Sequence, residues 1–213
     1  MKKLFIILGM FSLSIASFGQ SKFEKAMLVN IDSLYLSLQT DTEIKTISII
    51  DNIVKTADNR WEPLYYAAYG YCRLSLSEKN DSIKDEYCDR GQVFLTKALS
   101  LAPEESELYV LQGFLDNMRL IVNPMMRGMK YMNMIEESYK TAEKLDSLNP
   151  RTYYMRAQFV LNTPTFMGGG KENALPLFQK AIQKFDTFTS VNILAPRWGK
   201  ENCLKMIAEC SNK

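Results

Sequence analysis

Apolar residues recur every three or four positions along most of this chain, and glycine and proline fall mainly between the periodic blocks. This spacing predicts amphipathic helices, with the first over Phe23–Gln39 and a second that Asp41 can cap. Pro63 lies in the first turn of a third helix, where its missing N–H costs nothing. Pro124 is expected to end the fifth helix, and the sixth is expected to start at Gly128. Along the whole chain the pattern predicts an all-α fold of about nine helices.

Three of the predicted helices share a stripe of small and large residues on one face. The clearest copy is Ala174, Phe178 and Ala181, which fall at i, i+4 and i+7. The small residues let a neighbouring helix approach closely, and the large residue fills the gap between them. The same spacing recurs at Gly91, Leu95, Ala98 and at Ile135, Tyr139, Ala142. The partner helices carry a large residue followed four positions later by a small one, at Leu64–Ala68, Tyr109–Gly113 and Tyr153–Ala157.

These positions resemble the tetratricopeptide repeat, a helix–turn–helix unit of about 34 residues. Three such units cover residues 61–103, 106–150 and 151–185, and a helix over 196–210 is expected to cap the stack. The first two units run longer than the family norm, with extra residues around 77–87 and 121–131. The resemblance implies antiparallel helix pairs stacked into a right-handed α-α superhelix.

The first 19 residues have the pattern of a secretory signal peptide. Two lysines, at positions 2 and 3, precede an apolar run from 4 to 18, and small residues stand at positions 17 and 19. The run is about 15 residues long, shorter than a bilayer-spanning helix requires. We expect cleavage after Gly19, with residues 20–213 forming a single periplasmic or secreted domain that does not insert into a membrane. Retention of the segment as an anchor is the alternative.

Charge and composition exclude several classes of function. Without the two leader lysines, 26 − 2 = 24 basic residues balance 24 acidic ones, so nothing favours nucleic acid as a partner. The chain contains no histidine, which removes Ser–His and Cys–His nucleophilic pairs and the commonest transition-metal ligand. The cysteines form no C-x-x-C pair. We therefore expect no enzymatic activity, no metal and no cofactor.

Two local features each allow two interpretations. Cys72 and Cys88 lie equally far from a predicted helix turn near Asn80, so they can form a disulfide in an exported protein or remain two buried thiols. Gly168, Gly169 and Gly170 precede Lys171 at the start of a helix, and backbone N–H groups there can bind an anion. The other interpretation of the glycines is a turn that needs unusual φ angles.

In tetratricopeptide proteins the first helix of each unit lines a concave groove that holds an extended peptide or a helix. The resemblance implies groove positions at Tyr65, Tyr69, Arg73, Val110, Phe114, Asn117, Tyr154, Gln158 and Asn162. Tyrosine and amide side chains suit such a role because they combine apolar area with polar tips. The alternative is that the tyrosines form the core between repeats.

The function expected from these features is a non-enzymatic scaffold that binds a protein or peptide in its groove. The alternative is a ligand-binding accessory subunit of a solute uptake system, similar to the T component of tripartite transporters. That component is built from comparable degenerate repeats, and the aromatic interior predicted here can enclose an apolar ligand. The oligomeric state is open.

Overall fold

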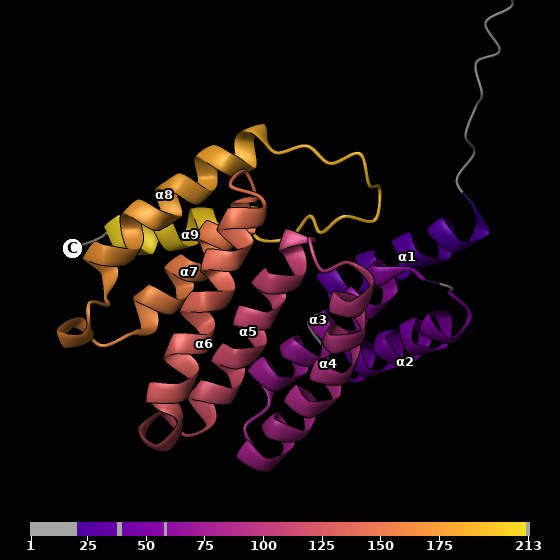
Figure 1. The fold of residues 1–213 in the computed structure, drawn as a ribbon, viewed down its shortest axis with the longest axis horizontal. Helices are drawn as coiled ribbons and strands as arrows, with labels where there is room; N and C mark the ends of the chain where they lie inside the picture. The colour runs from indigo at the N-terminus through magenta and orange to yellow at the C-terminus, as the bar shows by residue number, and fades with distance from the viewer. Residues whose placement is uncertain (1–20, 38–39, 58, 212–213) are drawn as a thin grey trace, which may run out of the picture.

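In a computed structural model the described residues are 21–37, 40–57 and 59–211, and over these ranges the chain is helical with no strand. The predicted signal peptide lies outside the described residues. The structure confirms the all-α fold, with nine α-helices and one short 3-10 helix, η1, in the described ranges (Figure 1). In chain order they are α1 (Lys22–Leu36), α2 (Thr40–Thr56), α3 (Trp61–Ser77), α4 (Asp81–Leu101), α5 (Ser106–Val122), α6 (Pro124–Leu145), α7 (Pro150–Asn162), η1 (Thr165–Met167), α8 (Lys171–Thr187) and α9 (Lys200–Ser211).

Polar residues just before the helices fix where several of them begin. Ser21 and Glu24 form a reciprocal capping box on α1, and Asn80 accepts hydrogen bonds from two backbone N–H groups of α4. Asn123 caps α6, whose first residue is Pro124. The helix predicted to start at Gly128 therefore starts four residues earlier, because a capped proline opens a helix as readily as it ends one.

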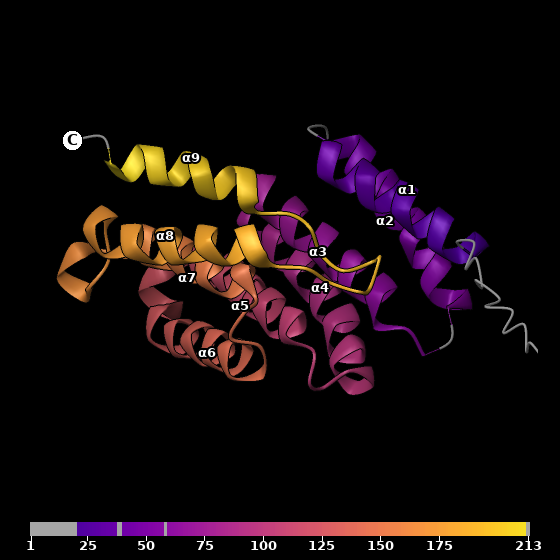
Figure 2. The same ribbon diagram turned by 90° about the horizontal axis from the view of Figure 1, so that it is seen from above.

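The helices pack as consecutive antiparallel pairs. The most extensive contacts join α3 to α4, α5 to α6 and α7 to α8. Helices α3, α5 and α7 also contact one another in sequence, so they form an inner layer with α4, α6 and α8 outside it (Figures 1 and 2). Helices α1 and α2 pack at the α3 end of this array, and α9 packs on α8. None of the described helices is long and apolar enough to cross a membrane.

The predicted small–large–small stripes are buried packing faces. Ala174, Phe178 and Ala181 are fully buried, as are the members of the two earlier stripes. At Gly113 a Cβ atom would lie 2.4 Å from the ring of Tyr139, so only glycine lets α5 approach α6 at this point. The paired large and small positions thus set how closely the helices of a pair approach.

Of the two interpretations of Cys72 and Cys88, a disulfide or two buried thiols, the structure has the buried thiols. Both residues are free thiols buried between α3 and α4, and the Cys88 Sγ atom lies 3.4 Å from the hydroxyl of Ser75. Burial raises the pKa of both thiols. They act as small apolar side chains of the core.

Candidate functional site

The segment between α8 and α9, residues 188–199, has no helix and runs across the inner layer toward α1 and α3; we call it the strap (Figures 1 and 2). Its Leu194 side chain is buried, and the Leu194 carbonyl accepts a hydrogen bond of 2.8 Å from the hydroxyl of Tyr66. Arg197 forms an ion pair with Asp32 of α1. The strap therefore ties the end of the chain to its first helices.

Trp198 anchors the strap in an aromatic cluster on the inner layer. Its indole N–H donates to the hydroxyl of Tyr65 at 3.0 Å, and its ring stacks on Tyr69 with the centroids 5.2 Å apart. The ring of Tyr154, on α7, meets it edge-on at 6.2 Å. The next residue, Gly199, has a φ of 109°, which only glycine adopts readily. The capping helix predicted from 196 consequently begins at Lys200, after this turn.

A buried ion pair lies beneath the strap. The Nε atom of Arg151 donates to both carboxylate oxygens of Glu107, at 2.8 and 2.9 Å, and the arginine is only 1% exposed. The rings of Phe188 and Trp198 cover the guanidinium, with centroids 5.1 and 5.9 Å away. Burial acts to lower the pKa of Arg151, but the charge and hydrogen bonds of Glu107 outweigh it and the net shift is upward.

Most of the predicted groove residues are part of the packed interior. The buried ones are Tyr65, Tyr69, Val110, Phe114 and Tyr154. Arg73 donates to the carbonyls of Leu34 and Ser37 and pairs with Glu43, so it fastens α1 and α2 to α3. The remaining three, Asn117, Gln158 and Asn162, are partly buried or exposed. The three predicted groove tyrosines are thus part of the core, as in the alternative interpretation. The strap covers Tyr65 and Tyr69.

The glycine turn before α8 has a structural role. Gly168 and Gly170 have φ angles of 85° and 95°, and a Cβ atom on Gly169 would overlap the carbonyl of Thr163 at 1.9 Å. All three glycine N–H groups donate to backbone carbonyls, and Lys171 donates to the carbonyl of Glu209 at 3.0 Å. The three glycine amides are therefore not available to an anion, because the turn uses each of them to hold its own shape.

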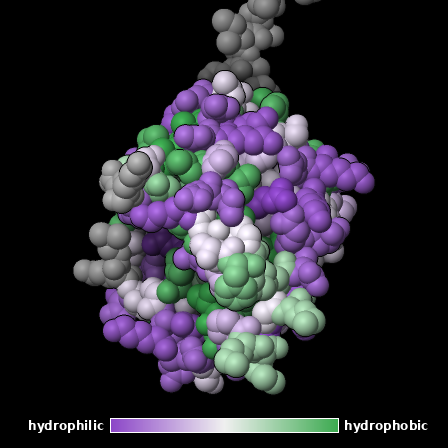
Figure 3. Space-filling view, turned by 90° about the vertical axis from the view of Figure 1, so that its left-hand side faces the viewer, coloured by the Kyte–Doolittle hydropathy of each residue, from purple (hydrophilic) through white to green (hydrophobic). Residues whose placement is uncertain are grey.

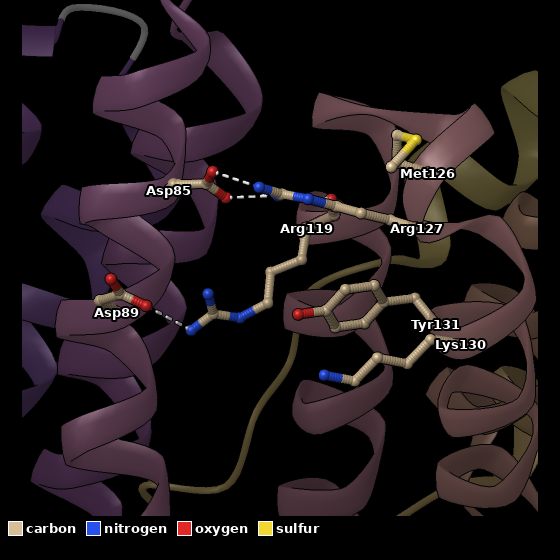
Figure 4. Close-up of a pocket in the computed structure, with 7 residues that line it drawn as sticks. All are labelled: Asp85, Asp89, Arg119, Met126, Arg127, Lys130 and Tyr131. Atoms are coloured by element: carbon tan, nitrogen blue, oxygen red, sulfur yellow. Dashed lines mark hydrogen bonds and ion pairs between the residues drawn. The ribbon is translucent and has the colours of Figure 1, made fainter.

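A pocket of about 390 Å³ opens between the outer side of α4 and the turn joining α5 to α6. Asp85 and Asp89 line it from α4, facing Arg119 of α5 and Arg127 of α6 (Figure 4). Arg127 donates to both oxygens of Asp85 at 2.7 Å, and Arg119 lies 2.8 Å from Asp89. The Arg127 pair holds α6 against α4, and the Arg119 pair holds α5 against α4.

The same pocket contains a cation, Lys130, that forms no close ion pair within the described part of the chain, although its charge acts at longer range on the buried carboxylate of Asp116. Three cations line it against two carboxylates, and the third cation is Lys130. Within the described ranges no carboxylate lies at ion-pair distance from Lys130; its Nζ atom lies 5.2 Å from the ring centroid of Tyr131. In Figure 4 both side chains extend from α6 toward the gap before α4. The pocket therefore has a net charge of +1.

Exposed methionines adjoin this pocket. Met125, Met126 and Met129, in the first turns of α6, are 97%, 83% and 88% exposed, and Met126 also lines the pocket. Figure 3 shows hydrophobic side chains gathered on the lower part of the face that includes the α5–α6 turn, between hydrophilic ones. We call Met125, Met126 and Met129, with Lys130 and the pocket beside them, the methionine surface. Exposed apolar groups gathered beside charges are typical of binding surfaces.

The spacing of the methionines could have indicated this surface, but they lie in a segment that the repeat pattern treats as an insertion. Residues 121–131 read as an insertion that made the second repeat unit too long. In a helix that starts at Pro124, however, Met125 and Met129 fall four positions apart and share a face, and Met126 stands between that face and Lys130. The strap gave no comparable signal, since it has no periodicity.

No family model and no curated protein matches this chain. Among solved structures, the HusA haemophore from Porphyromonas gingivalis has a similar fold, with a TM-score of 0.80 and 28% sequence identity. The alignment covers 91% of this chain and 95% of that one. The likeness therefore extends over nearly the full length of both chains.

Proposed function

We propose that this chain is an exported, non-enzymatic protein that binds haem or a closely related tetrapyrrole. The observation that carries the proposal is the likeness to a haemophore, at 28% identity over 91% of this chain. The signal-peptide pattern of residues 1–19 supports export. We further propose that the chain is a degenerate member of the tetratricopeptide repeat family, which the stacked helix pairs support.

The available side chains limit how such a protein would hold the iron. Haem iron in proteins is held by histidine, cysteine, methionine or tyrosine, and this chain has no histidine. Cys72, Cys88 and Cys203 are buried free thiols, and burial raises the pKa of each. Exposed thioethers are present on the methionine surface, beside an unpaired cation. These side chains suit an amphiphile with an apolar ring, an iron that accepts a thioether ligand and anionic substituents.

Peptide binding on the inner layer is a second candidate function. Its support is that an inner tyrosine already holds a main-chain group, since Tyr66 donates to the carbonyl of Leu194 in a turn of the strap. An external peptide would have to displace the strap and its anchor Trp198. The accessory role in solute uptake differs from haem binding mainly in the ligand, and both require a small-molecule site.

The test is a titration of the mature chain, purified without a histidine tag, with haem and with iron-free protoporphyrin. We expect saturable binding at micromolar concentrations, seen as a shift of the Soret band and as quenching of the fluorescence of Trp61 and Trp198. Absence of saturable binding of both porphyrins would contradict the proposal. To test the second candidate, peptides selected from a library for binding to this protein are titrated in the same way. Saturable binding of such a peptide without porphyrin binding would favour peptide recognition.

A further inference from the structure

We infer that the methionine surface is where this protein binds its tetrapyrrole, with the exposed thioethers against the ring and iron and Lys130 toward a propionate. The inference rests on the proposed function and adds to it the location of the site and the role of its residues. Three observations carry it, namely the exposure of the methionines, the spacing that brings them together, and the unpaired charge next to them.

Helical geometry makes the three methionines one surface. Met125 and Met129 are four residues apart, and Met126 and Met129 are three apart, so their side chains are neighbours on α6. A flat ring laid on them would cover side chains that are now mostly exposed. Methionine adapts its shape to a partner and its sulfur is a soft ligand for iron. Leucine at these positions would supply the same apolar area without a ligand atom.

The positive charge of Lys130 lies beside the methionines, where a haem placed on them would have a propionate. Met126 borders both the methionine face and the pocket, and Lys130 lies one helical turn after it. Arg119 and Arg127 are committed to Asp89 and Asp85, so Lys130 is the cation left to meet a carboxylate. A ring on the methionines would point a propionate at this ammonium group, and the acidic residues of α4 lie on the far side of the pocket (Figure 4).

The strap-covered face is less suited to the same ligand. A second pocket, of about 310 Å³, lies beneath the strap, but Glu105, Glu107 and Asp146 are among its lining residues. Arg151 neutralises only Glu107, and burial raises the pKa of Glu105, which shows that a negative charge there is already unfavourable. A propionate entering this pocket would meet like charges in a partly desolvated site.

The test compares haem and iron-free protoporphyrin on the triple variant Met125→Leu, Met126→Leu, Met129→Leu, with Met206→Leu on α9 as its control. We expect the triple variant to bind haem at least about tenfold more weakly and with an altered Soret band, in both oxidation states of the iron. Its affinity for iron-free protoporphyrin should stay within about twofold, because leucine preserves the apolar area. The control variant should match the wild type with both ligands.

A second arm tests the propionate contact. Lys130→Gln should weaken haem and protoporphyrin binding by about threefold, and should leave binding of the dimethyl ester of haem unchanged, because an exposed ion pair is of modest strength. Lys144→Gln, on the last turn of the same helix, is the matched control.

The outcomes separate the two proposals. A wild-type chain that binds haem, beside a triple variant with the same spectrum and affinity, would overturn the site while leaving the function standing. A wild-type chain that binds neither porphyrin would overturn both. Equal weakening of the esterified and the free haem by Lys130→Gln would overturn the propionate contact.

Discussion

The strap-covered face and the methionine surface both combine apolar and charged side chains. In the first these side chains contact one another, and in the second they are exposed. Under the strap, aromatic rings stack on one another, Arg151 is bound to Glu107, and tyrosine hydroxyls are hydrogen-bonded. On the methionine surface, thioethers face solvent and Lys130 has no carboxylate at ion-pair distance within the described residues. Groups that satisfy one another stabilise the fold, whereas groups without internal partners are free to bind a ligand. The contrast assigns stability to the first region and binding to the second.

The largest effect predicted by this contrast is at the buried ion pair. Arg151→Met would leave Glu107 buried without its partner, at a cost of about 3–5 kcal/mol in the free energy of unfolding. Arg90→Met, which removes an exposed pair with Glu86, should cost less than about 1 kcal/mol. Urea denaturation of both variants measures the difference. Equal costs would mean that the strap does not shield Arg151 from water.

The next effect is at the anchor of the strap. Trp198→Ala removes the stacking on Tyr69 and the hydrogen bond to Tyr65, and should lower the free energy of unfolding by about 2–3 kcal/mol. Val191→Ala, at an exposed position of the same strap, should change it by less than about 0.5 kcal/mol. Denaturation monitored by circular dichroism gives both values. A Trp198→Ala variant as stable as the control would show that the strap is loosely held.

The packing stripes show what the sequence could predict. Ala174, Phe178 and Ala181 were recognisable as a buried face because a helix repeats its orientation every few residues, so local spacing is sufficient. The position of Tyr65 and Tyr154 on the inner helices was implied by the resemblance to the tetratricopeptide repeat. The sequence did not predict that the strap covers these tyrosines. The strap has no hydrophobic periodicity, and its contacts join residues as far apart as Asp32 and Arg197.

The methionine surface was missed for a different reason. The spacing of apolar residues indicates only that Pro124 ends the fifth helix, although a proline preceded by a capping Asn123 also begins a helix. With the helix starting at Gly128, Met125 and Met126 would have been loop residues and the shared face with Met129 would not exist. Whether this surface could be predicted from the sequence therefore depended on interpreting Pro124 as the end of one helix or as the start of the next.

A smaller effect is expected at Asp116, a buried carboxylate of α5 that accepts a hydrogen bond from Gln112. Burial raises the pKa of Asp116 above its ordinary value of 3.8, against the opposing charges of Arg119 and Lys130. Because the folded state favours the protonated form, the ionised carboxyl destabilises the fold above that pH range. Asp116→Asn should therefore add about 1 kcal/mol at pH 7 and nothing below the ordinary pKa. A gain that persists at about pH 3 would contradict this.

The smallest effect on stability is expected on the methionine surface itself. The triple leucine variant of Met125, Met126 and Met129 should unfold within about 0.5 kcal/mol of the wild type, because these side chains have no packing partners to lose. Urea denaturation of the ligand-free protein checks this. A marked loss of stability would place the methionines with the packed interior and remove the contrast between the two regions.

The central claim, that the ligand binds on the methionine surface and leaves the strap-covered face closed, is tested most directly by NMR of methionine methyl groups. Ferric haem is paramagnetic and broadens the signals of nearby methyls, whereas iron-free protoporphyrin does not. We predict that haem selectively broadens Met125, Met126 and Met129 and leaves Met155, buried on α7 of the inner layer, unchanged. Broadening of Met155 with the three α6 methionines unaffected would contradict the account.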